Sequence, residues 1–377
     1  MRTTGPGSIV RMSEREQRGL QAPGGVLGEL EAAGRGGADV SPKRRRWRLV
    51  RNVLGALLSV ALFVWALRLG WTEQNIESVG RILGSEWELG ASLVGLTVLS
   101  IIVNGLTFWI LARPVAKLRA SDVVAVNAMA TFLALLPFKV SVIVRGLVHH
   151  RRDGVRFKDL VSWFASASAF GAVVLGPIAV ASLWRGELDA LWWLVALGGS
   201  LVGTVAGVVL GRLADRFRWL HTASLGADRI TRDARIAAIQ YALRVIDAVS
   251  LCLRFWVAAQ IVEMALGPSR ALLLGTSYFL LTILAPSGAL GVAEAGTSGV
   301  GALAGFELER VAGLALVVTA ANATVALLMA LVGAWWLRLD RVLFPRDAPT
   351  QRAEQSSERA SGRSCSGDRA RRPEPQR

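Results

Sequence analysis

The stretch LTILAPSGALGVAEA, residues 281–295, determines how the rest of the chain is interpreted. An apolar helical pattern is broken by a proline, a serine and two glycines before it resumes at a glutamate: Pro286, Ser287, Gly288, Gly291 and Glu294. Unwound backbone at membrane depth needs polar partners that lipid cannot supply. The segment is therefore predicted to lie inside a helical bundle or against a watery cavity. An ionisable residue there indicates a functional site; a glutamate satisfied by a neighbouring arginine, for packing alone, is the alternative.

The composition is that of a membrane protein. The chain has 377 residues, of which 53% are hydrophobic, with 13 tryptophans and a mean hydropathy of +0.44. Several apolar runs reach about 18 residues or more, which is enough to cross a bilayer as a helix. The predicted fold class is an all-α polytopic membrane protein. About six full spans are predicted, at residues 53–67, 89–112, 160–184, 191–211, 234–266 and 311–337.

The net charge of +15 is explained by membrane topology. Arginines and lysines cluster beside the apolar runs and in both tails, as expected for cytoplasmic segments, so nucleic acid is not an expected partner. Basic residues before the first span and after the last one predict cytoplasmic termini and a location in the cytoplasmic membrane. Residues 1–46 are predicted to be a disordered basic tail, 47–340 the membrane domain and 341–377 a second disordered tail.

Disulfide and metal chemistry are not predicted. Of the two cysteines, Cys252 lies in an apolar run and Cys365 in the polar tail. The chain has only three histidines, His149, His150 and His221, so a histidine metal site is not predicted. No cofactor is expected.

Two broken apolar segments are predicted to enter the membrane and return to the side from which they came. Residues 121–150 begin and end in basic loops around a central Pro137, so each leg has about 14 residues and spans about 21 Å, against about 30 Å of hydrocarbon. This pattern predicts a re-entrant hairpin whose tip is covered by other helices. Residues 271–305 predict a second hairpin, inserted from the opposite side. Two broken segments at corresponding positions indicate an inverted repeat with a substrate site near the midplane.

The predicted span 234–266 carries charges on one face. Arg244, Asp247 and Arg254 are separated by three and seven residues, so the charged stripe must face the bundle interior. Arg244 and Asp247 are interpreted as an internal ion pair. Arg254 has no second carboxylate nearby in the sequence and is the candidate for binding an anionic ligand. Asn104 is interpreted as a hydrogen-bond donor between helices.

The two broken segments also resemble a known family. Asn127 followed by LLPFKVSVIVRG, residues 135–146, is similar to the Asn and Leu-Pro-x-Arg-x-Gly-Asp/Glu-x-x-Arg pattern of the lysylphosphatidylglycerol synthase transmembrane region, also called the flippase-like family. APSGALGVAEA, residues 285–295, is similar to its Pro-x-x-Gly-Gly-Leu-Gly-Val-Arg-Glu-Ala pattern. The resemblance covers residues 48–340. Five positions depart from the family pattern: Lys139, Ser141, Val142, Ala289 and Ala293.

The resemblance implies a lipid flippase that moves anionic, aminoacylated or glycosylated lipids between leaflets. The soluble aminoacyl-transfer domain of the synthases is not expected, because the chain ends about 40 residues after its last predicted span. The protein is therefore not expected to be an enzyme. Substrate-binding or gating roles are assigned to Asn127, Pro137, Lys139, Arg145, Arg254, Pro286, Gly288, Gly291 and Glu294, with Arg244 and Asp247 as a supporting ion pair.

The mechanistic hypothesis is that Arg145 and Glu294 meet near the midplane and exchange partners as a headgroup passes; a static buried salt bridge is the alternative. Expected partners are lipids with phosphate-bearing headgroups, with a membrane protein or a second copy as further possibilities. Two other functions stay open. One is a non-catalytic partner of a lipid or cell-envelope synthesis enzyme. The other, less favoured, is a membrane glycosyltransferase, for which Glu73 and Glu77 are the available outer carboxylates.

Overall fold

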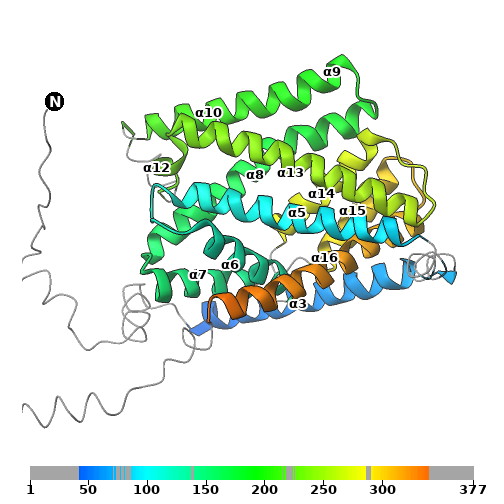
Figure 1. The fold of residues 1–377 in the computed structure, drawn as a ribbon, viewed down its shortest axis with the longest axis horizontal. Helices are drawn as coiled ribbons and strands as arrows, with labels where there is room; N and C mark the ends of the chain where they lie inside the picture. The colour runs from blue at the N-terminus through cyan, green and yellow to red at the C-terminus, as the bar shows by residue number, and fades with distance from the viewer. Residues whose placement is uncertain are drawn as a thin grey trace, which may run out of the picture. The chain divides into compact units, whose positions relative to one another are not determined.

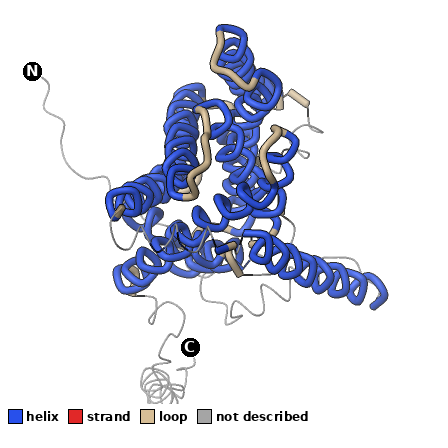
Figure 2. Tube along the Cα trace, turned by 90° about the vertical axis from the view of Figure 1, so that its right-hand side faces the viewer, coloured by secondary structure: helices blue, strands red, loops and turns tan. Residues whose placement is uncertain are grey.

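The computed structural model describes residues 42–70, 72–73, 77, 80, 86–136, 140–214, 216–217, 224, 226–285 and 290–338. Within these residues it contains helices and no strand, as Figure 2 shows. The helices are α3 (Pro42–Gly70), α5 (Trp87–Ala112), α6 (Ala120–Leu133), α7 (Val140–Asp153), α8 (Phe157–Arg185), α9 (Ala190–Trp193), the π-helix η1 (Leu194–Gly198), α10 (Gly199–Leu213), α12 (Asp228–Thr231), α13 (Ala234–Ile261), α14 (Pro268–Leu284), α15 (Val292–Leu303) and α16 (Leu308–Trp336).

The chain divides into two units, Met1–Leu54 and Gly55–Arg377. In the first unit the structure describes the beginning of α3, which starts at Pro42 and so lies partly within the tail predicted for residues 1–46. Proline is favourable at the first helical position because its missing N–H would have no partner there anyway. The rest of that predicted tail, and the tail predicted for 341–377, lie outside the described residues.

Among the described residues, six helices are long and apolar enough to cross a membrane, which confirms the predicted fold class. They are Val53–Gly70, Trp87–Ala112, Phe157–Arg185, Ala190–Leu213, Ala234–Ile261 and Leu308–Trp336. One predicted boundary is wrong: the span predicted for 234–266 ends at Ile261. Glu263 then adopts a positive φ of 51°, which is incompatible with a continuing helix.

Two pairs of short helices occupy the segments predicted to be hairpins. α6 and α7 have 14 residues each, while α14 has 17 and α15 has 12. In Figure 1, α6 and α7 lie toward the left end of the bundle, and α14 and α15 lie toward the right. All four are shorter than the roughly 20 residues that a full span needs. Their re-entrant insertion and the inverted repeat stay predictions.

The helix α5 organises the interior of the larger unit, because it packs against α6, α8, α13 and α16. Polar side chains in these contacts bond to backbone carbonyl oxygens. The indole of Trp163 donates to the carbonyl oxygen of Phe108 at 2.8 Å, and the amide of Gln240 donates to that of Thr107 at 2.8 Å. Such bonds satisfy buried donors and fix the rotation of α8 and α13 against α5.

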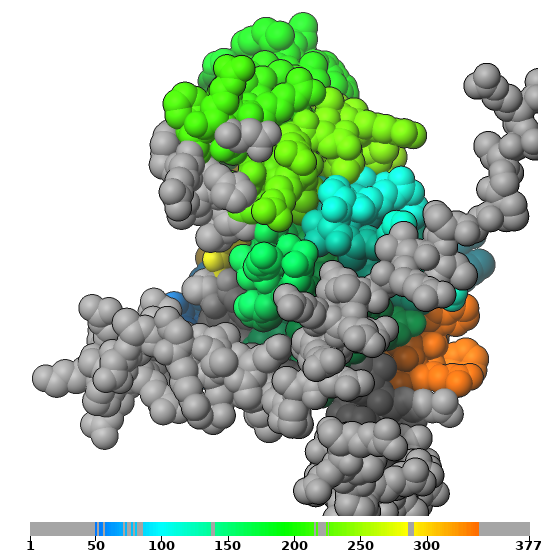
Figure 3. All heavy atoms as spheres, turned by 90° about the vertical axis from the view of Figure 1, so that its left-hand side faces the viewer, coloured from blue at the N-terminus to red at the C-terminus, as the bar shows by residue number. Residues whose placement is uncertain are grey.

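Basic loops gather at the end of the bundle that Figure 3 views. There α5, α7 and α16 end, while α6, α8 and α13 begin. Basic residues at or near these helix ends, and on the adjoining α10 and α12, include Arg113, Lys117, Arg119, Arg151, Arg152, Arg156, Lys158, Arg212, Arg229, Arg232, Arg235 and Arg338. This face is the one predicted to be cytoplasmic, and that orientation stays a prediction.

Candidate functional site

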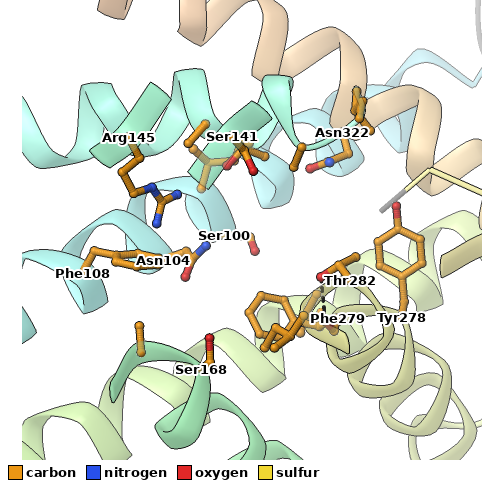
Figure 4. A pocket seen from close by; sticks show the side chains of 18 of the residues that line it. Ser100, Asn104, Phe108, Ser141, Arg145, Ser168, Tyr278, Phe279, Thr282 and Asn322 are labelled. Carbon is orange, nitrogen blue, oxygen red and sulfur yellow. Dashed lines mark hydrogen bonds between the residues drawn. The ribbon is translucent and has the colours of Figure 1, made fainter. Parts of the chain in front are cut away.

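A cavity of about 250 Å³ lies between α5, α6, α7, α8, α13, α14 and α16. Three arginines line it, and its described lining residues include no carboxylate: the arginines are Arg145, Arg244 and Arg254. Hydroxyl and amide side chains complete the polar part of the wall: Ser100, Asn104, Thr131, Ser141, Ser168, Tyr278, Thr282 and Asn322. Figure 4 shows Arg145 and Asn104 facing the same hollow as Ser168 and Phe279 on the other side.

Arg145 is held in place by two contacts on α5 and α6. Its Nη2 donates to Oδ1 of Asn127 at 2.9 Å, and its guanidinium carbon lies 3.9 Å from the centroid of the Phe108 ring. Asn127 is buried, and its own amide donates to the carbonyl oxygen of Ile101 at 2.9 Å. Because both ends of its amide are engaged, Asn127 positions the arginine while lying outside the cavity wall. The structure thus brings two of the predicted site residues together.

Arg244 and Asp247 form a buried ion pair, with Nη1 3.2 Å from Oδ2. The hydroxyl of Ser100 donates to the other carboxylate oxygen of Asp247 at 3.1 Å. Nη1 of Arg244 also donates to Oδ1 of Asn104 at 3.4 Å. Asn104 was predicted to donate between helices, whereas in this contact it accepts. Arg244 therefore brings a compensated charge to the cavity wall.

Arg254 differs from Arg244 because none of the described carboxylates forms an ion pair with it. Its side chain lines the cavity and is only 4% exposed. Its Nε and Nη2 are buried without a hydrogen-bond partner, and no carboxylate among the described residues pairs with it. An unsatisfied buried donor costs about 1–3 kcal/mol, and more when it is charged. The cavity wall therefore contains a guanidinium with two donors that an anion could satisfy.

Glu294 lies outside the cavity wall, in the first turn of α15. Its Oε2 accepts the N–H of Gly291 at 2.6 Å, and its Oε1 accepts the hydroxyl of Thr319 at 2.6 Å. The predicted meeting of Arg145 and Glu294 is thus absent from this conformation, since each side chain has other partners.

Position 291 requires glycine for two reasons, namely its backbone conformation and the close approach of a neighbouring helix. Its φ is +84°, and a Cβ atom there would overlap the carbonyl oxygen of Ser59 and lie 2.7 Å from the amide nitrogen of Phe63 on α3. Gly291 therefore lets α3 and the start of α15 make close contact. Four other predicted site residues, Pro137, Lys139, Pro286 and Gly288, lie outside the described residues.

Sequence reasoning missed several polar residues in and behind the wall. Tyr278, Thr319 and Asn322 lie in helices whose apolar composition conceals them, and no charge marks them. One usable signal was present: the chain has only two tyrosines, and Tyr278 falls within a short apolar helix, where a phenolic hydroxyl needs a partner.

Among the described residues, six apolar spans, two pairs of short helices and a cavity lined by three arginines define a polytopic membrane protein with polar groups inside its helical bundle. The family model for the lysylphosphatidylglycerol synthase TM region matches residues 52–334, and the chain belongs to this family. No curated protein and no solved structure matches the chain.

Proposed function

We propose that this protein translocates lipids with anionic, phosphate-bearing headgroups between the leaflets of the cytoplasmic membrane. The observation that carries the proposal is Arg254, a buried guanidinium in the cavity wall with two unpartnered nitrogens. A phosphate or a similar anionic group can accept from two guanidinium donors at once. The proposed role is binding and transport, with no covalent step.

The size of the cavity favours a headgroup over a whole lipid. A volume of about 250 Å³ is below the 300–1,000 Å³ that is typical of sites for drug-sized ligands. The acyl chains would therefore remain in the surrounding lipid. Leu136 and Leu284, which are 42% and 74% exposed, follow the cavity-lining residues Leu135 and Ile283 in the sequence. We place the route of the acyl chains beside these two helix ends.

The membership of the lysylphosphatidylglycerol synthase TM family supports this proposal, because that membrane domain is associated with lipid substrates. Two arginines in the wall have no ion-pair partner among the described residues, which supports anionic lipids as the substrate class. Arg145 and Arg254 would contact the phosphate, while the paired Arg244 would orient neighbouring polar groups. Hydroxyls and amides in the wall would accept a glycerol, sugar or aminoacyl substituent.

The test is leaflet exchange of labelled lipids in proteoliposomes that contain purified protein. Arg254→Gln should slow the exchange of anionic phospholipid on the order of 10- to 100-fold, the equivalent of one hydrogen bond to a charged group at about 1.5–3 kcal/mol. Arg310→Gln is the matched control, because Arg310 is a surface residue that pairs with Glu307. Exchange by the control should equal that of the wild type.

Two results would contradict the proposal. Wild-type protein of verified fold that exchanges no headgroup class faster than empty liposomes would favour a partner role beside another membrane protein. Equal slowing of anionic and zwitterionic lipids by Arg254→Gln would show that the arginine supports the fold and does not select the headgroup.

A further inference from the structure

Glu294 has a buried carboxyl group that lies outside the cavity lining. None of the described basic side chains forms an ion pair with it. The residue is 1% exposed. Its two oxygens accept from a backbone N–H and from a hydroxyl, both at 2.6 Å. Taking a carboxylate out of water without a counter-ion is costly. A carboxyl group in this position is therefore suited to carrying its own proton for part of a cycle.

A chain of hydroxyl groups joins this carboxyl to the cavity. Oε1 of Glu294 lies 2.6 Å from Oγ1 of Thr319, which lies 2.9 Å from the phenolic oxygen of Tyr278. Tyr278 is one of the cavity-lining residues, and Figure 4 shows its ring at the edge of the hollow. The three groups come from α15, α16 and α14. The path from cavity to carboxyl thus consists of two hydrogen bonds of ordinary length.

Both hydroxyls can reverse their donation, because each carries one proton and accepts on its oxygen. When Glu294 is ionised, Tyr278 donates to Thr319 and Thr319 donates to Oε1. When Oε1 carries a proton, it donates to Thr319, Thr319 donates to Tyr278, and the phenolic proton turns toward the cavity. A proton that enters from cavity water at Tyr278 therefore displaces one proton at each step. One proton leaves the cavity and one arrives on Glu294, with no net change at either hydroxyl.

We propose that Glu294 is a proton-binding site that exchanges protons with the cavity through Thr319 and Tyr278. The site goes beyond lipid binding, since it assigns an ion to a residue outside the cavity. A role for this proton in driving lipid transport rests on the proposed function. The binding of a proton by Glu294 does not.

Apart from the relay, the described hydrogen-bond partner of the Glu294 carboxyl is the backbone N–H of Gly291. Among the side chains that the structure describes, the charged residues on the helices that pack against α15 lie near helix ends: Arg270 on α14, Glu309 and Arg310 on α16, and Arg68 on α3. On the cavity side, Tyr278 is the titratable group of α14, and Arg254 and the Arg244–Asp247 pair belong to α13. These groups set the electrostatic potential at the cavity end of the relay, where Tyr278 lies.

The first experiment is pH-difference infrared spectroscopy on the full protein in lipid nanodiscs. Wild-type protein should show a carboxylic C=O band that appears on acidification and is missing in Glu294→Gln. Tyr278→Phe and Thr319→Val should keep the band but slow hydrogen–deuterium exchange of the carboxylic proton about tenfold or more, since a relay group has been removed. Thr276→Val is the matched control, because the hydroxyl of Thr276 bonds within its own helix.

Three outcomes overturn the proposal. They are the absence of a Glu294-dependent band, exchange in both relay variants as fast as in the wild type, or equal slowing by Thr276→Val. A titrating band in protein that moves no lipid would leave the proton site standing and refute the proposed function. Lipid exchange without a titrating band would refute the proton site and leave the proposed function standing. The two failures are therefore distinguishable.

Discussion

Replacing Arg254 by methionine should stabilise the protein in zwitterionic lipid while weakening its binding of anionic lipid. Arg254 is 4% exposed, and its Nε and Nη2 lack partners. Methionine fills a similar volume with no polar group to satisfy. A residue that is present for packing would give the opposite sign, because its removal would cost stability.

The magnitude follows from the two unpartnered donors. At about 1 kcal/mol or more for each buried unsatisfied donor, the variant should gain about 2 kcal/mol. For a membrane domain of this size, that gain raises the melting temperature by roughly 3 °C. Arg244→Met provides the contrast, because it leaves the buried Asp247 unpaired. Removing one partner of a buried pair costs about 3–5 kcal/mol, so this variant should melt well below the wild type.

The assay is thermal unfolding in zwitterionic nanodiscs, repeated with anionic lipid. A lipid present at 100 times its dissociation constant stabilises the protein that binds it by about 2.7 kcal/mol. Anionic lipid should therefore raise the melting temperature of the wild type and leave that of Arg254→Met nearly unchanged. The variant, which melts higher in zwitterionic lipid, should then melt at the same temperature as the wild type or below it.

The reasoning is refuted if Arg254→Met melts lower than the wild type in zwitterionic lipid. It is also refuted if the variant responds to anionic lipid as strongly as the wild type. In either case the two unpartnered nitrogens would not define a ligand site.

Two further predictions concern the backbone and the surface. Gly291→Ala should lower the melting temperature, since it adds about 1–3 kcal/mol of strain at a φ of +84° and a clash with α3; Gly299→Ala, with open space around the new methyl group, should not lower it. The hydrogen bond from Arg185 holds the pKa of Asp189 below its usual range. The cap from Asp189 to the N–H of Trp192 is therefore present above the pKa of an unfolded aspartate, about 3.9, and is lost only as the pH falls through the lower folded value. Hydrogen exchange at the Trp192 amide, corrected for its intrinsic pH dependence, should keep its protection at pH 3.9; loss of protection at or above that pH would contradict the assignment.

The spans were predictable because each apolar run carries its own signal. The second span was predicted to begin at residue 89 and begins at Trp87. The one large error, at the end of α13, has a specific cause. Met264 and Leu266 lie in the turn after the helix and are buried in the core. These residues are apolar because they are buried in the core. A hydropathy window gives the same signal for buried apolar residues in a turn and for a helix that continues.

The charged site residues were also predictable, because an ionisable group in an apolar run is costly and therefore conspicuous. Arg145, Arg254 and the Arg244–Asp247 pair fall in this class. Which of them face one another was not predictable from spacing, since contacts between helices depend on packing rotations that one helix does not encode. Glu294 illustrates this: its partner is Thr319, 25 residues further along the chain.

The charges around the cavity connect the two proposals. Arg244 is neutralised by Asp247, so Arg145 and Arg254 carry the uncompensated positive charge. Ionised Glu294, two hydrogen bonds behind the wall, offsets part of that charge, and a proton on Glu294 restores it. Anionic headgroups should therefore bind more tightly when Glu294 is protonated.

Glu294→Gln fixes the neutral state of this side chain. The variant should bind anionic lipid at alkaline pH about as tightly as the wild type does at acidic pH, and its own affinity should not change between the two. Lipid-dependent shifts of the melting temperature at both pH values measure this. A wild-type affinity that is independent of pH, or a variant that keeps the wild-type dependence, would separate the proton site from the cavity. Charge coupling between a buried carboxyl and two arginines would then not explain why this carboxylate lies so close to an anion site.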